Sequence, residues 1–131
     1  MDIFEAINSG NLTEIDRSIK ASADSLSSLN GYGQTALHMA IEKHLFLPTK
    51  KLIESGAPLD AQNTMDKNTP LLLALHIRNT ATSEMLIAAG ANPDIQNKDG
   101  DTALILAVKK GFLATVRQLL DAGANPDIQS N

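Results

Sequence analysis

Short apolar runs recur along the chain at a nearly constant interval, and a threonine opens three of them. The runs read TALHMAI from Thr35, TPLLLAL from Thr69 and TALILAV from Thr102. Their apolar residues recur at helical spacing, and threonine is a good N-cap because its hydroxyl satisfies a free N–H of the first turn. Pro70 suits the first helical position, where no N–H is needed. The pattern predicts a short helix after each threonine.

A second apolar segment follows each run and ends at a Gly-Ala pair. The glycines lie 21 residues after the threonines, at Gly56, Gly90 and Gly123. Each is preceded by an apolar pair: Leu52-Ile53, Leu86-Ile87 and Leu119-Leu120. Glycine tolerates the left-handed conformation that ends many helices, so a second helix is predicted before each one. Two short antiparallel helices and an extended turn then make one structural unit.

The extended turn is itself repeated, because GANPDIQ stands at residues 90–96 and again at 123–129. A catalytic loop is normally needed once, whereas a connector is needed wherever the unit it connects is repeated. The first 29 residues fit the same unit without its threonine, since Asp2 with Glu5 forms a start similar to a capping box. The expected units are residues 1–29, 30–62, 63–96 and 97–131.

These motifs together resemble the ankyrin repeat family. TALHMA at 35–40 is similar to the signature Thr-Pro-Leu-His-x-Ala, and the 33-residue period, the Gly-Ala pairs and the Asp99-Gly100-x-Thr102 segment are also similar. The resemblance implies an all-α solenoid in one domain: an N-terminal capping repeat and three further repeats, with helix-turn-helix units joined by extended β-turn fingers. The chain departs from the family pattern at five positions: Leu72, Ile105, Lys67, His44 and Arg78.

Composition narrows the class of protein further. The chain of 131 residues is 43% hydrophobic but only 3% aromatic, so its core must be built from Leu, Ile and Ala. It has no cysteine, which excludes disulfides and thiolate chemistry. No segment approaches the roughly 20 apolar residues that span a bilayer, and the N-terminus does not resemble a secretory signal. We therefore expect an intracellular, cytoplasmic protein with no membrane partner.

The charge distribution and the apolar residues of the last repeat indicate which partners to expect. The net charge is −4, of which −3 falls in residues 1–29, and no face is obviously basic, so a nucleic-acid partner is not expected. A repeat cannot bury its apolar face alone, and terminal repeats need a polar outer surface. The last repeat carries Val116, Leu119 and Leu120 and stops within a connector. We expect a fragment of a longer array or an interface at that end, which leaves self-association open.

No catalytic or cofactor-binding motif accompanies the repeats. His38, His44 and His76 lack partners at metal-ligand spacing, and the resemblance implies that His38 bonds loop backbone. The nucleophile elbow Gly-x-Ser-x-Gly and a phosphate-binding glycine loop are both absent. We therefore expect no cofactor, no metal and no enzyme activity. The alternative is a regulatory or substrate-docking segment of a larger enzyme or effector.

What remains is recognition of a protein partner. The resemblance implies that partners bind the fingertips and the groove lined by the first helices. The candidate fingertip residues are Tyr32, Gln34, Met65, Lys67, Asn68, Lys98 and Asp101. The candidate groove residues are Met39, Lys43, Leu73, Ile77, Leu106 and Lys110. Tyr32 either anchors a partner or packs on the neighbouring turn, and Met39, Leu73 and Leu106 either form an exposed apolar strip or pack between helices.

Overall fold

The computed structural model describes residues 2–131, which form helices and contain no strand. The predicted all-α fold is confirmed. The α-helices come in four consecutive pairs: α1 (Ile3–Ser9) and α2 (Leu12–Ala21), α3 (Ala36–Glu42) and α4 (Phe46–Glu54), α5 (Pro70–His76) and α6 (Thr80–Ala88), and α7 (Ala103–Lys110) and α8 (Leu113–Asp121). One short 3₁₀ helix, η1 (Ala23–Leu26), follows the first pair.

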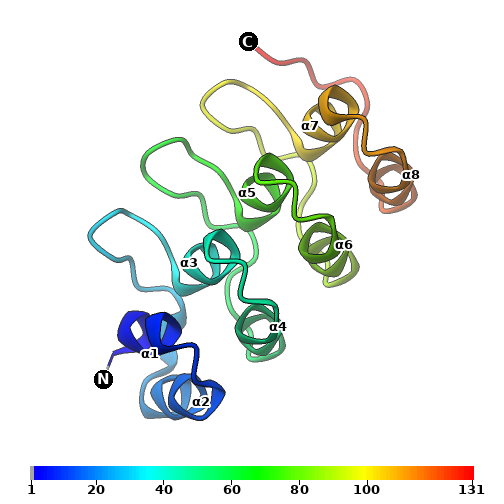
Figure 1. Ribbon diagram of the computed structural model, residues 1–131. Helices are drawn as coiled ribbons and strands as arrows, with labels where there is room; N and C mark the ends of the chain where they lie inside the picture. The colour runs from blue at the N-terminus through cyan, green and yellow to red at the C-terminus, as the bar shows by residue number, and fades with distance from the viewer. Residues whose placement is uncertain (1) are drawn as a thin grey trace.

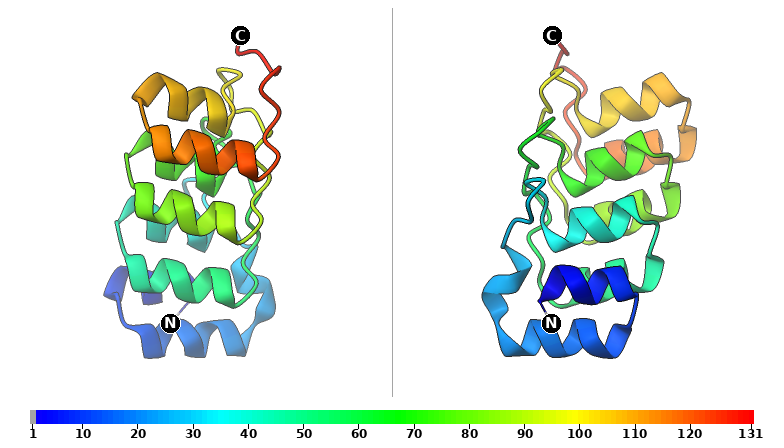
Figure 2. Two further views of the ribbon diagram at one scale, coloured as in Figure 1. Left: turned by 90° about the vertical axis from the view of Figure 1, so that its right-hand side faces the viewer. Right: turned by 60° about the vertical axis from the view of Figure 1, so that its left-hand side comes forward.

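The pairs stack into a two-layer solenoid (Figures 1 and 2). The first helices α1, α3, α5 and α7 contact one another in sequence and form the inner layer. The second helices α2, α4, α6 and α8 form the outer layer in the same order. The connectors between pairs project together from one side of the stack, beyond the inner layer (Figure 1). We call the projecting part of each connector a finger: residues 30–34, 63–68 and 97–101.

Side-chain caps begin the helices where the sequence predicts them. The hydroxyl oxygens of Thr35, Thr69 and Thr102 accept hydrogen bonds from the third residue of α3, α5 and α7, at 3.3, 3.2 and 3.3 Å. Asp2 and Glu5 form the expected capping box, with bonds of 2.8 and 3.2 Å. Each cap satisfies N–H groups that the helix itself leaves free.

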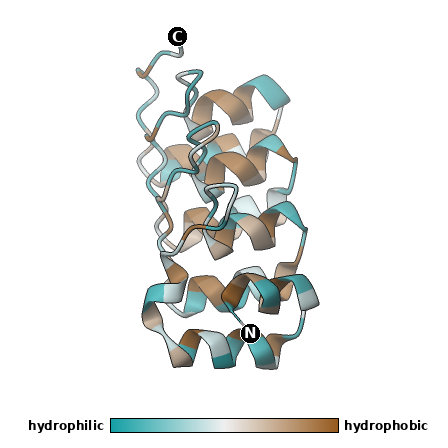
Figure 3. Ribbon diagram, turned by 90° about the vertical axis from the view of Figure 1, so that its left-hand side faces the viewer, coloured by the Kyte–Doolittle hydropathy of each residue, from teal (hydrophilic) through white to brown (hydrophobic). Residues whose placement is uncertain are grey.

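The core runs the length of the stack and contains Leu, Ile and Ala, as the composition predicts. Several of the largest buried apolar side chains occupy equivalent places in successive repeats, such as Leu37 and Leu71, or Leu52, Leu86 and Leu119. The full set is Ile7, Ile15, Leu37, Ile41, Leu52, Leu71, Leu72, Leu75, Leu86 and Leu119. In Figure 3 the helical layers carry most of the hydrophobic colour and the fingers are mostly hydrophilic. Small alanines between these residues let the helices of neighbouring repeats approach closely.

Candidate partner-binding groove

An asparagine at the base of each finger fixes its turn. The side-chain oxygens of Asn30, Asn63 and Asn97 each accept two backbone N–H bonds from their own finger, at 2.9–3.2 Å. A backbone bond closes each finger, from the N–H of the asparagine to the carbonyl of the residue before the capping threonine. The fingers are therefore narrow turns with their own hydrogen bonds, and their shape depends little on a partner.

Neighbouring fingers are also bonded to each other. Thr64 N–H donates to Gly33 at 3.2 Å, and Lys98 N–H donates to Asp66 at 3.0 Å. A β-carbon on Gly33 would clash with Thr64, so glycine permits this close approach. The row of fingers is in this way preorganised, which lowers the entropy lost when a ligand binds.

His38 joins the start of α3 to the next finger. Its Nε2 lies 2.8 Å from the carbonyl of Asn68, while Nδ1 accepts from the N–H of Thr35 at 3.3 Å. These contacts require the neutral tautomer with the proton on Nε2. Burial lowers the pKa of His38, because desolvation penalises the charged imidazolium; the hydrogen bond to Asn68 and the charges of Asp66 and Glu42 oppose this shift. The prediction that His38 bonds loop backbone is confirmed.

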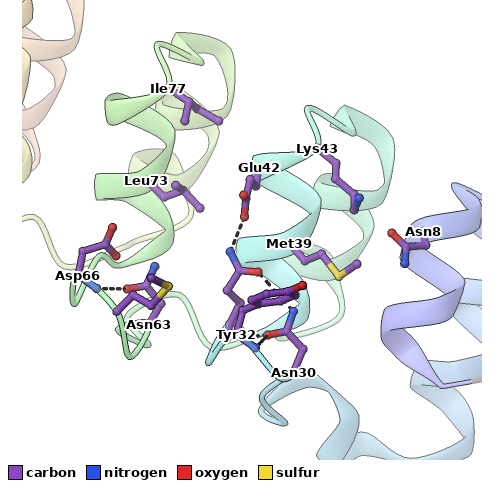
Figure 4. A pocket seen from close by; sticks show the side chains of 12 residues that line it. Asn8, Asn30, Tyr32, Met39, Glu42, Lys43, Asn63, Asp66, Leu73 and Ile77 are labelled. Carbon is purple, nitrogen blue, oxygen red and sulfur yellow. Dashed lines mark hydrogen bonds between the residues drawn. The ribbon is translucent and has the colours of Figure 1, made fainter.

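A groove of about 610 Å³ lies between the first two fingers and the inner helices (Figure 4). Seven of the candidate residues line it: Tyr32, Gln34, Met39, Lys43, Met65, Leu73 and Ile77. Five further residues complete the lining: Asn8, Asn30, Glu42, Asn63 and Asp66. Met39 and Lys43 come from the α3 side and Leu73 and Ile77 from the α5 side (Figure 4). The groove therefore joins apolar side chains, amides and charges from three successive repeats.

Two large hydrophobic side chains stand exposed on adjacent fingers beside this groove. Tyr32 is 73% exposed and Met65 is 75% exposed. Tyr32 is therefore not covered by the neighbouring turn, which was one of the two interpretations of its position. Exposed aromatic and thioether side chains next to an apolar depression are typical of residues that anchor a protein partner.

The groove contains three charged side chains, and one carboxylate oxygen of Asp66 is buried. Within residues 2–131, Lys43, Glu42 and Asp66 form no ion pair with one another or with other residues. Glu42 accepts a hydrogen bond from the amide of Gln34, and Asn30 donates to the same amide at 3.3 Å. These two hydrogen bonds hold the amide of Gln34 in one orientation in the lining of the groove.

Three candidate residues lie inside the protein. This corrects the placement of Asn68 and Asp101 at exposed fingertips, and for Leu106 it favours the second of the two interpretations, packing between helices. Asn68 is buried. Its carbonyl accepts from His38, its N–H donates to Asn63, and its side-chain oxygen accepts from Asn97. Asp101 is buried and accepts from the ammonium of Lys109 at 3.0 Å. Leu106 packs between inner helices, Leu73 is also largely buried, and Met39 is half-buried. The apolar strip formed by these three residues is therefore mostly interior.

The last three candidates lie outside the groove. Lys67 and Lys98 are exposed on the second and third fingers, and Lys110 is half-buried at the end of α7. The sequence analysis missed the asparagines of the site, although Asn30, Asn63 and Asn97 recur at intervals of 33 and 34 residues. That recurrence could have identified the turns, whereas no pattern connects Asn8 on α1 with the groove.

Two other kinds of site receive no support in the described range. Residues 2–131 contain no group of three His, Asp or Glu side chains that could hold a metal ion. None of the helices in this range has the length and apolar character needed to cross a membrane.

Stacked antiparallel helix pairs with projecting fingers define the chain as a helical-repeat solenoid. A family model described as ankyrin repeats (3 copies) matches residues 48–130. The chain belongs to the ankyrin repeat family, as its motifs predict. Ankyrin repeats are generally protein-interaction modules.

Solved ankyrin domains have the same architecture. The chain matches the ankyrin repeat domain of Bcl-3, a member of the IkappaB family, with a TM-score of 0.87 and 27% identity over 98% of this chain and 57% of the other. It matches an ankyrin repeat domain from Acinetobacter baumannii with a TM-score of 0.86 and 28% identity, over 98% of this chain and 65% of the other.

A curated relative is much longer than this chain. It is a putative palmitoyltransferase, ZDHHC13, of Danio rerio, and it is 37% identical over 76 residues. The match covers 57% of this chain but only 12% of the relative. The chain therefore corresponds to only a small part of that relative's length.

Proposed function

We propose that this chain is a non-enzymatic module that binds a protein partner along the groove and the first two fingers. The proposal rests on the exposure of Tyr32 and Met65 beside this groove. A partner that covers them removes two large apolar side chains from water, which favours association. Hydrogen bonds already hold the fingers, so little further ordering opposes binding. Lys67 and Lys98, exposed on the second and third fingers, extend the proposed surface.

Burial decides which groove residues can be substituted in a test without unfolding the protein. Leu73→Glu would place a carboxylate among buried helices and destabilise the fold, so loss of binding would be ambiguous. Tyr32→Ala with Met65→Ala removes exposed side chains only and leaves the helices intact. The matched control is Phe46→Ala with Leu113→Ala, which removes an exposed aromatic and an exposed aliphatic side chain outside the groove.

The experiment begins with capture of a partner by the wild-type chain, followed by titration of that partner against both double variants. We expect the groove variant to bind at least about tenfold more weakly, since exposed aromatic anchors commonly contribute more than 1 kcal/mol. The control variant should bind as the wild type does. Equal loss in both variants, or none in either, would move the site away from the groove.

A second candidate is a regulatory or substrate-docking segment of a larger enzyme. Its support is the similarity to part of a putative palmitoyltransferase. A reading frame that joins this sequence to a catalytic domain would support this candidate. A gene that encodes the repeats alone would contradict it.

A further inference from the structure

The outer side of the last helix pair exposes apolar side chains whose counterparts in the preceding repeats are buried or half-buried. Val108 of α7 is 61% exposed, whereas its counterparts Ile41 and Leu75 are fully buried at 0%. Leu120 of α8 is 47% exposed, whereas its counterpart Ile87 is 6% exposed. In the preceding repeats the next helix pair covers these positions. The last pair thus presents one half of a repeat–repeat interface.

A series of hydrogen bonds links successive connectors, and at the same end its last acceptor has no donor within residues 2–131. Asp60 accepts from the N–H of Asn92 at 2.9 Å, and Asp94 accepts from the N–H of Asn125 at 2.9 Å. Asp127 is the next member of this series, and within residues 2–131 its carboxylate has no donor.

A glutamine series shows the same feature. The amide of Gln62 donates to the carbonyl of Gln96 at 2.9 Å, and the amide of Gln96 donates to the carbonyl of Gln129 at 3.0 Å. The amide of Gln129 meets no acceptor in the part of the chain that the structure describes. Apolar exposure and unused hydrogen-bonding groups therefore coincide on one surface.

We propose that α7, α8 and residues 125–129 form a docking surface for one further regular ankyrin-type repeat, stacked in register. That repeat covers Val108 and Leu120 with its helix pair. Its connector donates a backbone N–H to Asp127 and offers a carbonyl to the amide of Gln129. This inference extends a contact that already occurs between consecutive repeats of the molecule, and it does not depend on the groove.

A second copy of this chain fits the surface less well. Stacked head to tail, it would offer its first repeat, in which η1 occupies the place of the extended connector. Asp24 of η1 would then stand where Asn92 and Asn125 stand in the regular repeats, opposite the carboxylate of Asp127. Stacked face to face, two copies would bring their Asp127 carboxylates to one interface without the N–H donors they need. Both arrangements bury charge without compensation.

The test uses the whole chain with a second copy of residues 97–129 placed directly after Gln129 as the docked repeat. In this extended chain we expect Asp127→Ala with Gln129→Ala to raise the unfolding equilibrium constant in urea by about tenfold or more, because two hydrogen bonds are lost. In the 131-residue chain the same variant should leave unfolding unchanged. Asp94→Ala with Gln96→Ala is the matched control and should destabilise both chains.

Two results would overturn the proposal. One is an equal effect of the Asp127 and Gln129 substitutions in both chains, since the appended repeat would then not use these groups. The other is a dimer of the 131-residue chain in sedimentation equilibrium that Val108→Lys dissociates, which would make a second copy the occupant. A monomeric 131-residue chain, together with an effect of the Asp127 and Gln129 substitutions that is confined to the extended chain, supports it.

Discussion

Four equivalent residues turn the chain from the first helix of each pair to the second. Gly10 and Gly111 occupy this position in the first and last pairs, with φ of 70° and 73°. His44 and Arg78 occupy it in the middle pairs and adopt the same left-handed conformation, with φ of 57° and 65°. A side chain in this conformation costs roughly 1–2 kcal/mol, because its β-carbon crowds the following carbonyl. At His44 and Arg78 the departure from the family pattern therefore adds strain without changing the turn.

The first prediction follows from that strain. His44→Gly should raise the free energy of unfolding by about 0.5–1 kcal/mol, since relief of strain exceeds the added freedom of the unfolded chain. Gly111→Ala should lower it by about 1 kcal/mol, although an added β-carbon meets no atom within 4 Å. Urea unfolding at pH 7.5 measures both changes.

The control for this prediction is His76→Gly. His76 ends α5 in helical conformation, so glycine there should destabilise the protein by up to about 1 kcal/mol. If glycine has the same sign of effect at positions 44 and 76, left-handed strain does not explain the result.

At the scale of elements, the fingers are attached to the helices through a small number of buried polar groups. His38 bonds the carbonyl of Asn68, and Asn97 donates to the side chain of Asn68 at 3.1 Å. This network ties α3 to the second finger and the second finger to the third. Its stability depends on a neutral His38, because the charged ring would be buried and would have to donate through both nitrogens.

The second prediction concerns pH. The unfolded chain protonates His38 near its ordinary pKa of 6.5, whereas the folded protein holds this pKa lower. The unfolded state then binds more protons just below pH 6.5, so stability should fall as the pH falls from 6.5 through the folded pKa. The slope should not exceed about 1.4 kcal/mol per pH unit for this one group.

Urea unfolding at several pH values between 7.5 and 5.5 measures that slope. His38→Leu, which introduces the residue found at the equivalent position 72, should flatten it even if overall stability also falls. His44→Gln and His76→Gln are controls at exposed histidines and should retain the slope. An unchanged slope in His38→Leu would assign the pH dependence to other groups.

At the scale of the whole molecule, each repeat is stabilised by the neighbours it contacts. The pair α5–α6 packs against helix pairs on both sides, whereas α7–α8 packs against α5–α6 alone within the described residues. In such arrays stability is approximately a sum of repeat and interface terms. The last pair should therefore open more readily than the pair before it.

The third prediction is a gradient of hydrogen exchange. Backbone amides of α7 and α8 should exchange at least about tenfold faster than those of α5 and α6, because opening the last pair breaks one interface rather than two. Exchange followed by NMR at pH 7 measures the difference. Uniform protection over both pairs would instead indicate a single cooperative unit.

Much of the site follows from local sequence, and the remainder depends on contacts between repeats. The capping threonines, the helix-ending glycines and the role of His38 could be predicted, since each depends on residues within one repeat or on a family motif. The burial of Asn68 and Asp101 could not. Their neighbours, Asn97 and Lys109, reach them only after the chain has folded back into adjacent fingers and helices.

The sequence by itself determined the repeat, its helix pairs, its caps and the position of its turns, because these depend on periodicity and on short-range hydrogen bonds. The repeated GANPDIQ segment belongs to this part, since its residues act in the same way wherever the repeat recurs. Only the tertiary structure decided which of the apolar and polar side chains remain exposed. Equivalent residues such as Leu75 and Val108 differ in burial because, within residues 2–131, a following repeat packs against Leu75 and none packs against Val108.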